Sequence, residues 1–189
     1  TSNQFENIKS KVFLVNASIR DEFKVETLVD LKKKGSLIGI DLQGFIRTID
    51  KNNILINSDW EEKKEALGLT HYLKADGVEA EFLTGESDLI SAAKILKSYG
   101  PKEIIITHKD GGLVYDGENV FQEPFILDKI VGRSGRGDTC GASYVYKRLT
   151  LNAKNSIKWA AAATSLKMES DTPLKNTIRE IENRVSKYE

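Results

Sequence analysis

The sequence predicts an α/β fold in which helices are layered on a mostly parallel β-sheet, and three observations indicate it. Short apolar runs such as "EIIIT" (103–107) are typical of buried parallel strands. These runs alternate with segments whose apolar residues recur at helical spacing, which favours helical crossovers between the strands. With 189 residues and 40% hydrophobic content, the chain can form one domain with a sizeable core, which we expect to span residues 1–189.

The predicted elements alternate regularly as far as Thr107. Four segments are expected to form buried strands: "KVFLVN", "SLIGID", "HYLKAD" and "EIIIT". Of these, "HYLKAD" has the weakest strand pattern. Helices are expected over Phe23–Lys34, in a segment carrying Val78, Phe82 and Leu83, and over Leu89–Leu96, where Gly100-Pro101 ends the last one.

The pattern changes after Thr107. The pairs Asp110-Gly111 and Asp116-Gly117 flank "LVY" and predict two β-hairpin turns, hence a small antiparallel flap beside the parallel sheet. Three helices should follow: one beginning near Asp138, one containing the alanine run around Ala161, and one with Leu174, Ile178, Ile181 and Val185 in phase. The alanine run indicates close backbone approach to a neighbouring helix or, less often, to a flat ligand.

Three glycines surround one aspartate at the start of the helix near Asp138. Gly135, Gly137 and Gly141 allow a tight turn with free N–H groups, and together with the helix dipole these groups form an anion site. A carboxylate in such a place is electrostatically unfavourable unless it has a chemical role. The residues alone leave two interpretations of Asp138 open, a catalytic group or an ordinary helix N-cap.

Charge and cysteine content narrow the classes of partner. Lys plus Arg equals Asp plus Glu, 28 each, so the net charge indicates neither a nucleic-acid partner nor an anionic membrane surface. The single Cys140 excludes an intrachain disulfide and fits a reducing compartment, and no apolar run reaches membrane-spanning length. We therefore expect a cytoplasmic protein that binds a small molecule.

Two known phosphate-binding patterns do not account for the glycines. The P-loop pattern is absent, and Gly135-x-Gly137-x-x-x-Gly141 only approaches the dinucleotide fingerprint. That motif lies late in the chain, is not followed by a βαβ unit, and has no acidic residue about 20 positions on to bind a ribose. A dinucleotide-dependent oxidoreductase is therefore the weakest alternative.

Several segments together resemble the ribokinase, or PfkB, family of carbohydrate and nucleoside kinases. "SGRGDTCGASY" resembles the Gly-x-Gly-Asp signature of this family, and "DGVEAEFLTGE" its Asn-x-x-Glu segment. "IIITHKDGGLVYDG" resembles the nucleotide strand, "WAAAATSLKME" the alanine-rich helix beside adenine, and "IGIDLQGFIR" the Asp-x-Asn-x-Arg stretch. The similarity covers nearly all of this chain but only the C-terminal portion of the family.

The resemblance implies a three-layer αβα sandwich and an ATP-dependent, Mg²⁺-requiring kinase that phosphorylates a hydroxyl of a small sugar, polyol or nucleoside. Asp138 would be the general base, and Gly135, Arg136 and Gly137 would lie at the anion hole for the transferred phosphoryl group. The other implied roles are metal binding through Glu79, nucleotide binding through Asp76, Thr107, Lys109, Gly112 and Ala161, and acceptor binding through Asp41, Gln43 and Arg47.

The departures from the family pattern leave some roles open. Lys109 replaces a glycine, Asp76 an asparagine and Arg136 a common alanine, while Gly132 and Arg133 stand where Asp and Thr are frequent. Glu79 also fits a solvated helix residue, and Asp41 also fits a turn-forming aspartate. The lid and the Gly-Gly motif of the acceptor half are not found before "KVFLVN". We therefore expect a fragment or a truncated relative. A homodimer is expected only if the complete protein has that lid. The alternative function is that of a non-catalytic nucleotide-binding relative.

Overall fold

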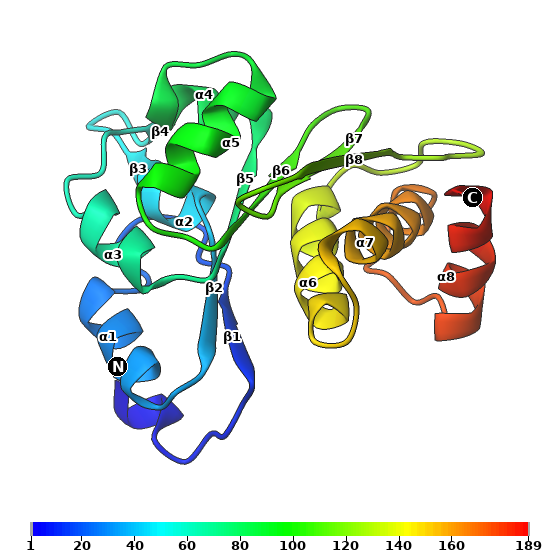
Figure 1. Ribbon diagram of the computed structural model, residues 1–189. Coiled ribbons are helices and arrows are strands. Elements are labelled where there is room, and N and C mark those ends of the chain that lie inside the picture. Colours follow the sequence, from blue (N-terminus) through cyan, green and yellow to red (C-terminus); the bar gives the residue numbers. More distant parts are fainter. Residues whose placement is uncertain (1, 189) are drawn as a thin grey trace.

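The computed structural model describes residues 2–188 and contains a central six-stranded sheet with the order β1-β2-β5-β6-β7-β8. The first four of these strands are parallel, and β7 and β8 extend the sheet in antiparallel pairing (Figure 1). The strands are β1 (Val12–Val15), β2 (Leu37–Asp41), β5 (Tyr72–Asp76), β6 (Glu103–Thr107), β7 (Gly111–Tyr115) and β8 (Val120–Pro124). The expected parallel sheet and antiparallel flap are confirmed.

Helices lie on both faces of this sheet (Figure 1). One layer follows the early strands and contains α1 (Val25–Lys33), α3 (Lys63–Leu69), α4 (Gly77–Thr84) and α5 (Leu89–Ser98). The other layer contains α6 (Arg136–Arg148) and α7 (Ala153–Met168), with α8 (Ile178–Val185) packed on α7. Short helical turns η1 (Ser2–Phe5), α2 (Gln43–Ile46) and η2 (Ser186–Tyr188) complete the described elements.

The alternation of side chains along β6 separates the two cores. Ile104 and Ile106 pack with the buried side chains of α1, α3 and α5, whereas Ile105 packs with Tyr144 and Ile157 from the opposite layer. A strand with apolar side chains on both faces has to be covered on both sides, which explains the uniformly apolar sequence of this run. The three-layer αβα arrangement of the sequence-based prediction is confirmed.

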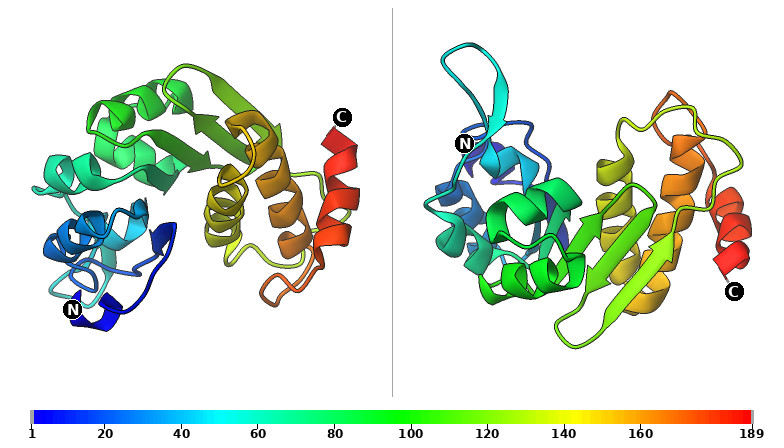
Figure 2. Two further views of the ribbon diagram at one scale, coloured as in Figure 1. Left: turned by 60° about the horizontal axis from the view of Figure 1, so that its bottom comes forward. Right: turned by 90° about the horizontal axis from the view of Figure 1, so that it is seen from above.

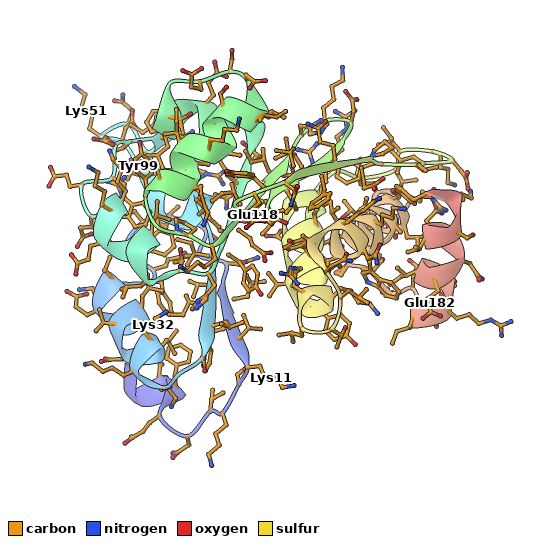
Figure 3. The ribbon with its side chains drawn as sticks, viewed as in Figure 1. Lys11, Lys32, Lys51, Tyr99, Glu118 and Glu182 are labelled. Atoms are coloured by element: carbon orange, nitrogen blue, oxygen red, sulfur yellow. The ribbon has the colours of Figure 1, made fainter. Side chains whose placement is uncertain are left out.

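Charged side chains mark the outer surfaces of the two helical layers. Lys32 on α1 and Glu182 on α8 are exposed at opposite sides of the molecule (Figure 3).

No helix among the described residues is both long and apolar enough to cross a bilayer.

Two helix predictions and one turn prediction differ from the structure in detail. The last helix begins at Ile178 and leaves Leu174 outside, because Thr177 caps it by accepting a hydrogen bond from the backbone N–H of Glu180. The helix after β5 exists, but Val78 and Phe82 are exposed and only Leu83 of the expected apolar residues is buried. Gly111 belongs to β7 and not to the turn before it.

A hairpin that the sequence did not predict follows α2. It consists of β3 (Arg47–Ile49) and β4 (Leu55–Asn57), which pair only with each other and project from the body of the molecule (Figure 2, right, cyan). Ile49, Ile54 and Leu55 are more than half exposed on it. Arg20 fixes its base, because its guanidinium donates hydrogen bonds to the carbonyl oxygens of Phe45 and Ser58.

Candidate active site

The glycine-rich segment forms a tight turn that leads directly into α6. Gly135 has φ +77°, a left-handed conformation that a residue with a Cβ adopts only with strain, and it is the N-cap of the helix. Helix α6 therefore begins at Arg136, two residues earlier than expected. Asp138 is the third residue of the helix and not its cap, so the N-cap interpretation of Asp138 is wrong.

A small polar pocket of about 140 Å³ lies at this helix N-terminus. Free N–H groups and the positive end of the helix dipole point into such a space and favour an anion. The pocket brings together residues that are distant in the sequence, from the turn after β2, the ends of β5 and β6, and the glycine turn: Gln43, Lys74, Asp76, Thr107, Arg133, Gly135, Arg136, Gly137 and Asp138.

The Thr107 hydroxyl supports the assignment of this pocket to a ligand. The residue is fully buried at the end of β6, it lines the pocket, and its Oγ1 has no hydrogen-bond partner among the residues that the structure describes. A buried hydroxyl without a partner is costly, so such a group is usually satisfied by a water molecule, an ion or a ligand. Phosphate oxygens in the pocket would accept its hydrogen bond.

Lys74 is a cation of the site that the sequence analysis missed. Its side chain rises from the middle of β5 and runs below α6, where a Cβ on Gly137 would lie 2.6 Å from Nζ. Gly137 is therefore needed to make room for this ammonium group. Lys74 is only 7% exposed, and a charged side chain inside a buried strand was the signal in "YLKAD" that could have identified it.

Lys74 joins two of the predicted carboxylates into one buried cluster. Its Nζ lies 2.9 Å from Asp41 Oδ2 and 3.9 Å from Glu79 Oε2. Burial alone would lower the pKa of Lys74, but the charges of Asp41 and Glu79 outweigh it and raise that pKa. Lys74 therefore stays charged near the bottom of the pocket, and Asp41 is more than a turn-forming aspartate.

Glu79 is buried behind Asp76 and is not a solvated helix residue. The two residues form a capping box at the start of α4: the Glu79 N–H donates to Asp76 Oδ1, and the Asp76 N–H donates to Glu79 Oε2. Burial raises the pKa of Glu79 to about 7, against the opposing charge of Lys74. Arg47 approaches the other oxygen, with 4.0 Å between its Nη2 and Glu79 Oε1.

The acidic residues fit a Mg²⁺ ion that keeps most of its water. Asp76 lines the pocket, with the carboxylate of Glu79 buried directly behind it. No cluster of three or more His, Cys, Asp or Glu side chains within residues 2–188 is arranged to hold a metal directly. Mg²⁺ commonly binds through one or two carboxylates, water and phosphate oxygens, so Asp76 and Glu79 suit an ion that arrives with its phosphate ligand.

A second buried lysine supports the glycine turn from the side of α7. Lys167 is 5% exposed, and its ammonium group donates a hydrogen bond to the Ser170 carbonyl oxygen at 3.2 Å. Its Cε would lie 3.5 Å from a Cβ on Gly135. The positive charge of Lys167 thus adds to the field at the N-terminus of α6.

Two of the residues predicted to bind the nucleotide, Ala161 and Gly112, are closely packed against other side chains. Ala161 is fully buried and packs with Phe125 and Met168, and Tyr188 covers the same cluster. A Cβ on Gly112 would lie 3.1 Å from the Ile157 side chain. Of the remaining residues in this group, Lys109 is exposed in the turn between β6 and β7.

Comparisons with known proteins identify the family. The model of the pfkB family of carbohydrate kinases matches residues 40–175. The chain belongs to this family. A search of curated protein sequences found no match.

The solved structures that resemble the chain include pyrophosphate-dependent kinases. One is a pyrophosphate-dependent myo-inositol-1 kinase converted into a myo-inositol-3 kinase, with 34% identity and a TM-score of 0.90 over 100% of this chain and 67% of the other. A pyrophosphate-dependent ribokinase-family kinase, complexed with a pyrophosphate analog and myo-inositol, has 34% identity and a TM-score of 0.89 over 97% of this chain and 66% of the other.

More distant structures share the fold. Arabidopsis thaliana ribokinase complexed with ribose and ATP has 19% identity and a TM-score of 0.76, over 93% of this chain and 56% of the other. The expected ribokinase-like architecture is therefore confirmed. The chain spans about two thirds of the length of the pyrophosphate-dependent kinases, 65–67%.

Proposed function

We propose that the protein transfers a phosphoryl group from inorganic pyrophosphate to a hydroxyl of a small polyol, with a cyclitol such as myo-inositol as the leading acceptor. The observation that carries the choice of donor is the packing around Ala161, which is fully buried in a cluster with Phe125, Met168 and Tyr188. The pyrophosphate dependence and the myo-inositol of the relatives at 34% identity support the same choice.

The pocket has the charge that a short, highly charged donor needs. Lys74, Arg133 and Arg136 line it, and the N-terminus of α6 adds the field of its dipole. The pocket volume of about 140 Å³ suits a phosphate group, whereas the pockets of drug-sized ligands measure about 300 Å³ or more. The donor would thus be held through its phosphates alone.

Asp138 acts on the acceptor in this proposal. Its carboxylate takes the proton of the acceptor hydroxyl while that oxygen bonds to the nearer phosphorus atom and the bridging P–O bond of pyrophosphate breaks. Orthophosphate leaves with the bond electrons, and the proton passes from Asp138 to solvent. Backbone N–H groups of Gly137 and Asp138 in the first turn of α6 stabilise the charge on the transferred phosphoryl oxygens, whereas the Arg136 N–H donates to the Arg133 carbonyl oxygen.

The other predicted residues take supporting roles. Mg²⁺, when bound with the donor beside Asp76 and Glu79, would supply neutralisation of phosphate charge. The Thr107 hydroxyl donates to a donor oxygen. Gln43 faces the same pocket from the turn after β2, so with Asp41 and Arg47 it would orient the acceptor.

ATP is the second candidate donor. Lys109 favours it, because this side chain is exposed two residues after Thr107, in the segment where the family resemblance places a nucleotide. The ATP complex of the more distant ribokinase shares only the fold with this chain. A nucleotide would require Phe125 and Tyr188 to move away from Ala161.

A direct experiment is to follow phosphorus NMR of the full-length protein with Mg²⁺, a polyol panel that includes myo-inositol, and either pyrophosphate or ATP. We expect pyrophosphate to be converted into orthophosphate and a phosphomonoester, with much slower use of ATP. Efficient transfer from ATP without transfer from pyrophosphate would overturn the choice of donor. Donor binding without transfer to any acceptor would favour the non-catalytic alternative.

A further inference from the structure

The side chain of Asp138 is held by a residue that follows β1, the strand at one edge of the central sheet. Asn16, which directly follows β1, donates a hydrogen bond from Nδ2 to Asp138 Oδ1 at 3.1 Å. The two residues are 122 positions apart in the chain, so only the fold brings them together. Asn16 and Asp138 are both exposed, and Asp138 also lines the pocket.

This contact distinguishes the two carboxylate oxygens of Asp138. Oδ1 accepts the amide hydrogen of Asn16, while Oδ2 is the oxygen nearer to the glycine turn, 4.0 Å from the position of a Cβ on Gly135. An exposed aspartate without such a contact would sample several rotamers. A fixed rotamer matters, because a general base is effective only within hydrogen-bond reach of the proton that it removes.

We propose that Asn16 is a positioning residue for Asp138: its amide holds Oδ1 and so leaves Oδ2 directed toward the acceptor hydroxyl. This inference rests on the proposed phosphoryl transfer and on Asp138 as its base, but it holds for either donor. The amide is suited to this task, because it donates a hydrogen bond without bringing a charge. A carboxylate of the same shape would repel Asp138.

The test is the kinetic comparison of Asn16→Asp and Asn16→Ala with the wild-type full-length protein. Asn16→Asp keeps the shape of the side chain but removes the donor, so it remains informative if Asn16→Ala does not fold. We expect kcat to fall about 10- to 100-fold, a part of the rate that a positioned base supplies, with unchanged KM for the donor. Asn53→Asp in the exposed hairpin turn is the matched control and should leave kcat unchanged.

A double-mutant cycle separates positioning from other effects. In an Asp138→Asn background, Asn16→Asp should cause no further loss of kcat, because the base that it positions is already absent. Additive losses would overturn the inference, and so would an effect confined to KM of the acceptor, which would make Asn16 an acceptor-binding residue.

Failure of the proposed function has its own signature. Wild-type protein without turnover on either donor would overturn the proposed function and the role of Asn16 with it. Wild-type turnover together with an unchanged rate in Asn16→Asp would overturn the role of Asn16 alone. The contact itself is checked independently by the side-chain amide NMR signals of Asn16, which should shift in Asp138→Asn.

Discussion

Gly137 shows how an absent side chain can place a charge. The residue lies in the first turn of α6, and the space that its Cβ would fill is taken by the end of Lys74 from β5. Lys74 in turn contacts Asp41. A single methyl group at position 137 would therefore disturb a cluster built from three different elements.

We predict that Gly137→Ala weakens donor binding about 10-fold or more, because the added Cβ displaces Lys74 Nζ and a charged hydrogen bond is worth about 1.5–3 kcal/mol. Isothermal titration calorimetry with Mg²⁺-pyrophosphate measures this change. Gly68→Ala in α3 is the matched control, because a Cβ on Gly68 meets nothing within 4 Å. Unchanged affinity in Gly137→Ala would contradict a donor role for Lys74.

We predict that Asp138→Asn leaves the affinity for the donor nearly unchanged. The same variant should lower kcat about 10²- to 10⁴-fold, which is the usual contribution of a positioned base. Steady-state kinetics combined with calorimetry separate the two effects. Asp21→Asn serves as control, because Asp21 is exposed and has φ 74°, which asparagine tolerates well. Wild-type turnover in Asp138→Asn would refute the base assignment.

Among the elements, α8 depends on a capping box at its start. Thr177 Oγ1 accepts from the Glu180 N–H, and Glu180 Oε2 accepts from the Thr177 N–H. The helix packs Ile181 against Trp159, Ala162 and Ala163 of α7. Helix α8 therefore supports α7, whose last turn carries Lys167 beside the glycine turn.

We predict that Thr177→Ala lowers the free energy of unfolding by about 1 kcal/mol through the loss of this cap. Urea denaturation measures the change, and Thr177→Ser should restore most of the stability because serine caps equally well. Since the substitution lies outside the pocket, donor affinity of the folded protein should remain as in the wild type. A loss of affinity as large as that of Gly137→Ala would indicate that α8 acts on the site itself.

The elements that the sequence predicted well have periodic patterns, and those that it missed do not. The four parallel strands and the long helices bury regular faces, so their spacing is visible in the residues. The β3–β4 hairpin has apolar residues that remain exposed, as with Ile54, and its base is held by hydrogen bonds from Arg20. Long-range contacts of this kind leave no local signature.

The same distinction applies to the site. The glycine turn, Asp138 and Thr107 belong to recognisable motifs, and the structure gathers them in one pocket. Lys74 and Asn16 take part only because β5 passes below α6 and the end of β1 approaches it. The side chains packed near Ala161 are Phe125, which directly follows β8, Met168 of α7 and Tyr188 of η2, and no single motif could reveal this combination.

At the level of the whole molecule, the buried charge cluster links stability to pH. The pKa of Glu79 rises from 4.5 to about 7, chiefly through burial. The folded protein then holds this proton more tightly than the unfolded chain does. The corresponding stability is fully present below pH 4.5 and is lost as the pH rises through about 7.

We therefore predict that Glu79→Gln becomes more stable relative to the wild type between pH 5 and pH 8, by up to about 3 kcal/mol. Urea denaturation in buffers free of Mg²⁺ and phosphate tests this change. Glu81→Gln on the exposed side of the same helix is the control and should show no such trend. A constant difference between pH 5 and pH 8 would show that Glu79 titrates normally.

The position of Lys74 also has a consequence for how the two substrates communicate. Its ammonium group contacts Asp41, which we propose orients the acceptor, and lies under α6, where we propose that the donor binds. With that arrangement, a ligand that shifts Lys74 from one side would change binding at the other, and the two binding free energies would be coupled. Thermodynamic linkage requires the effect to be mutual: the factor by which the first substrate changes the affinity for the second equals the factor by which the second changes the affinity for the first.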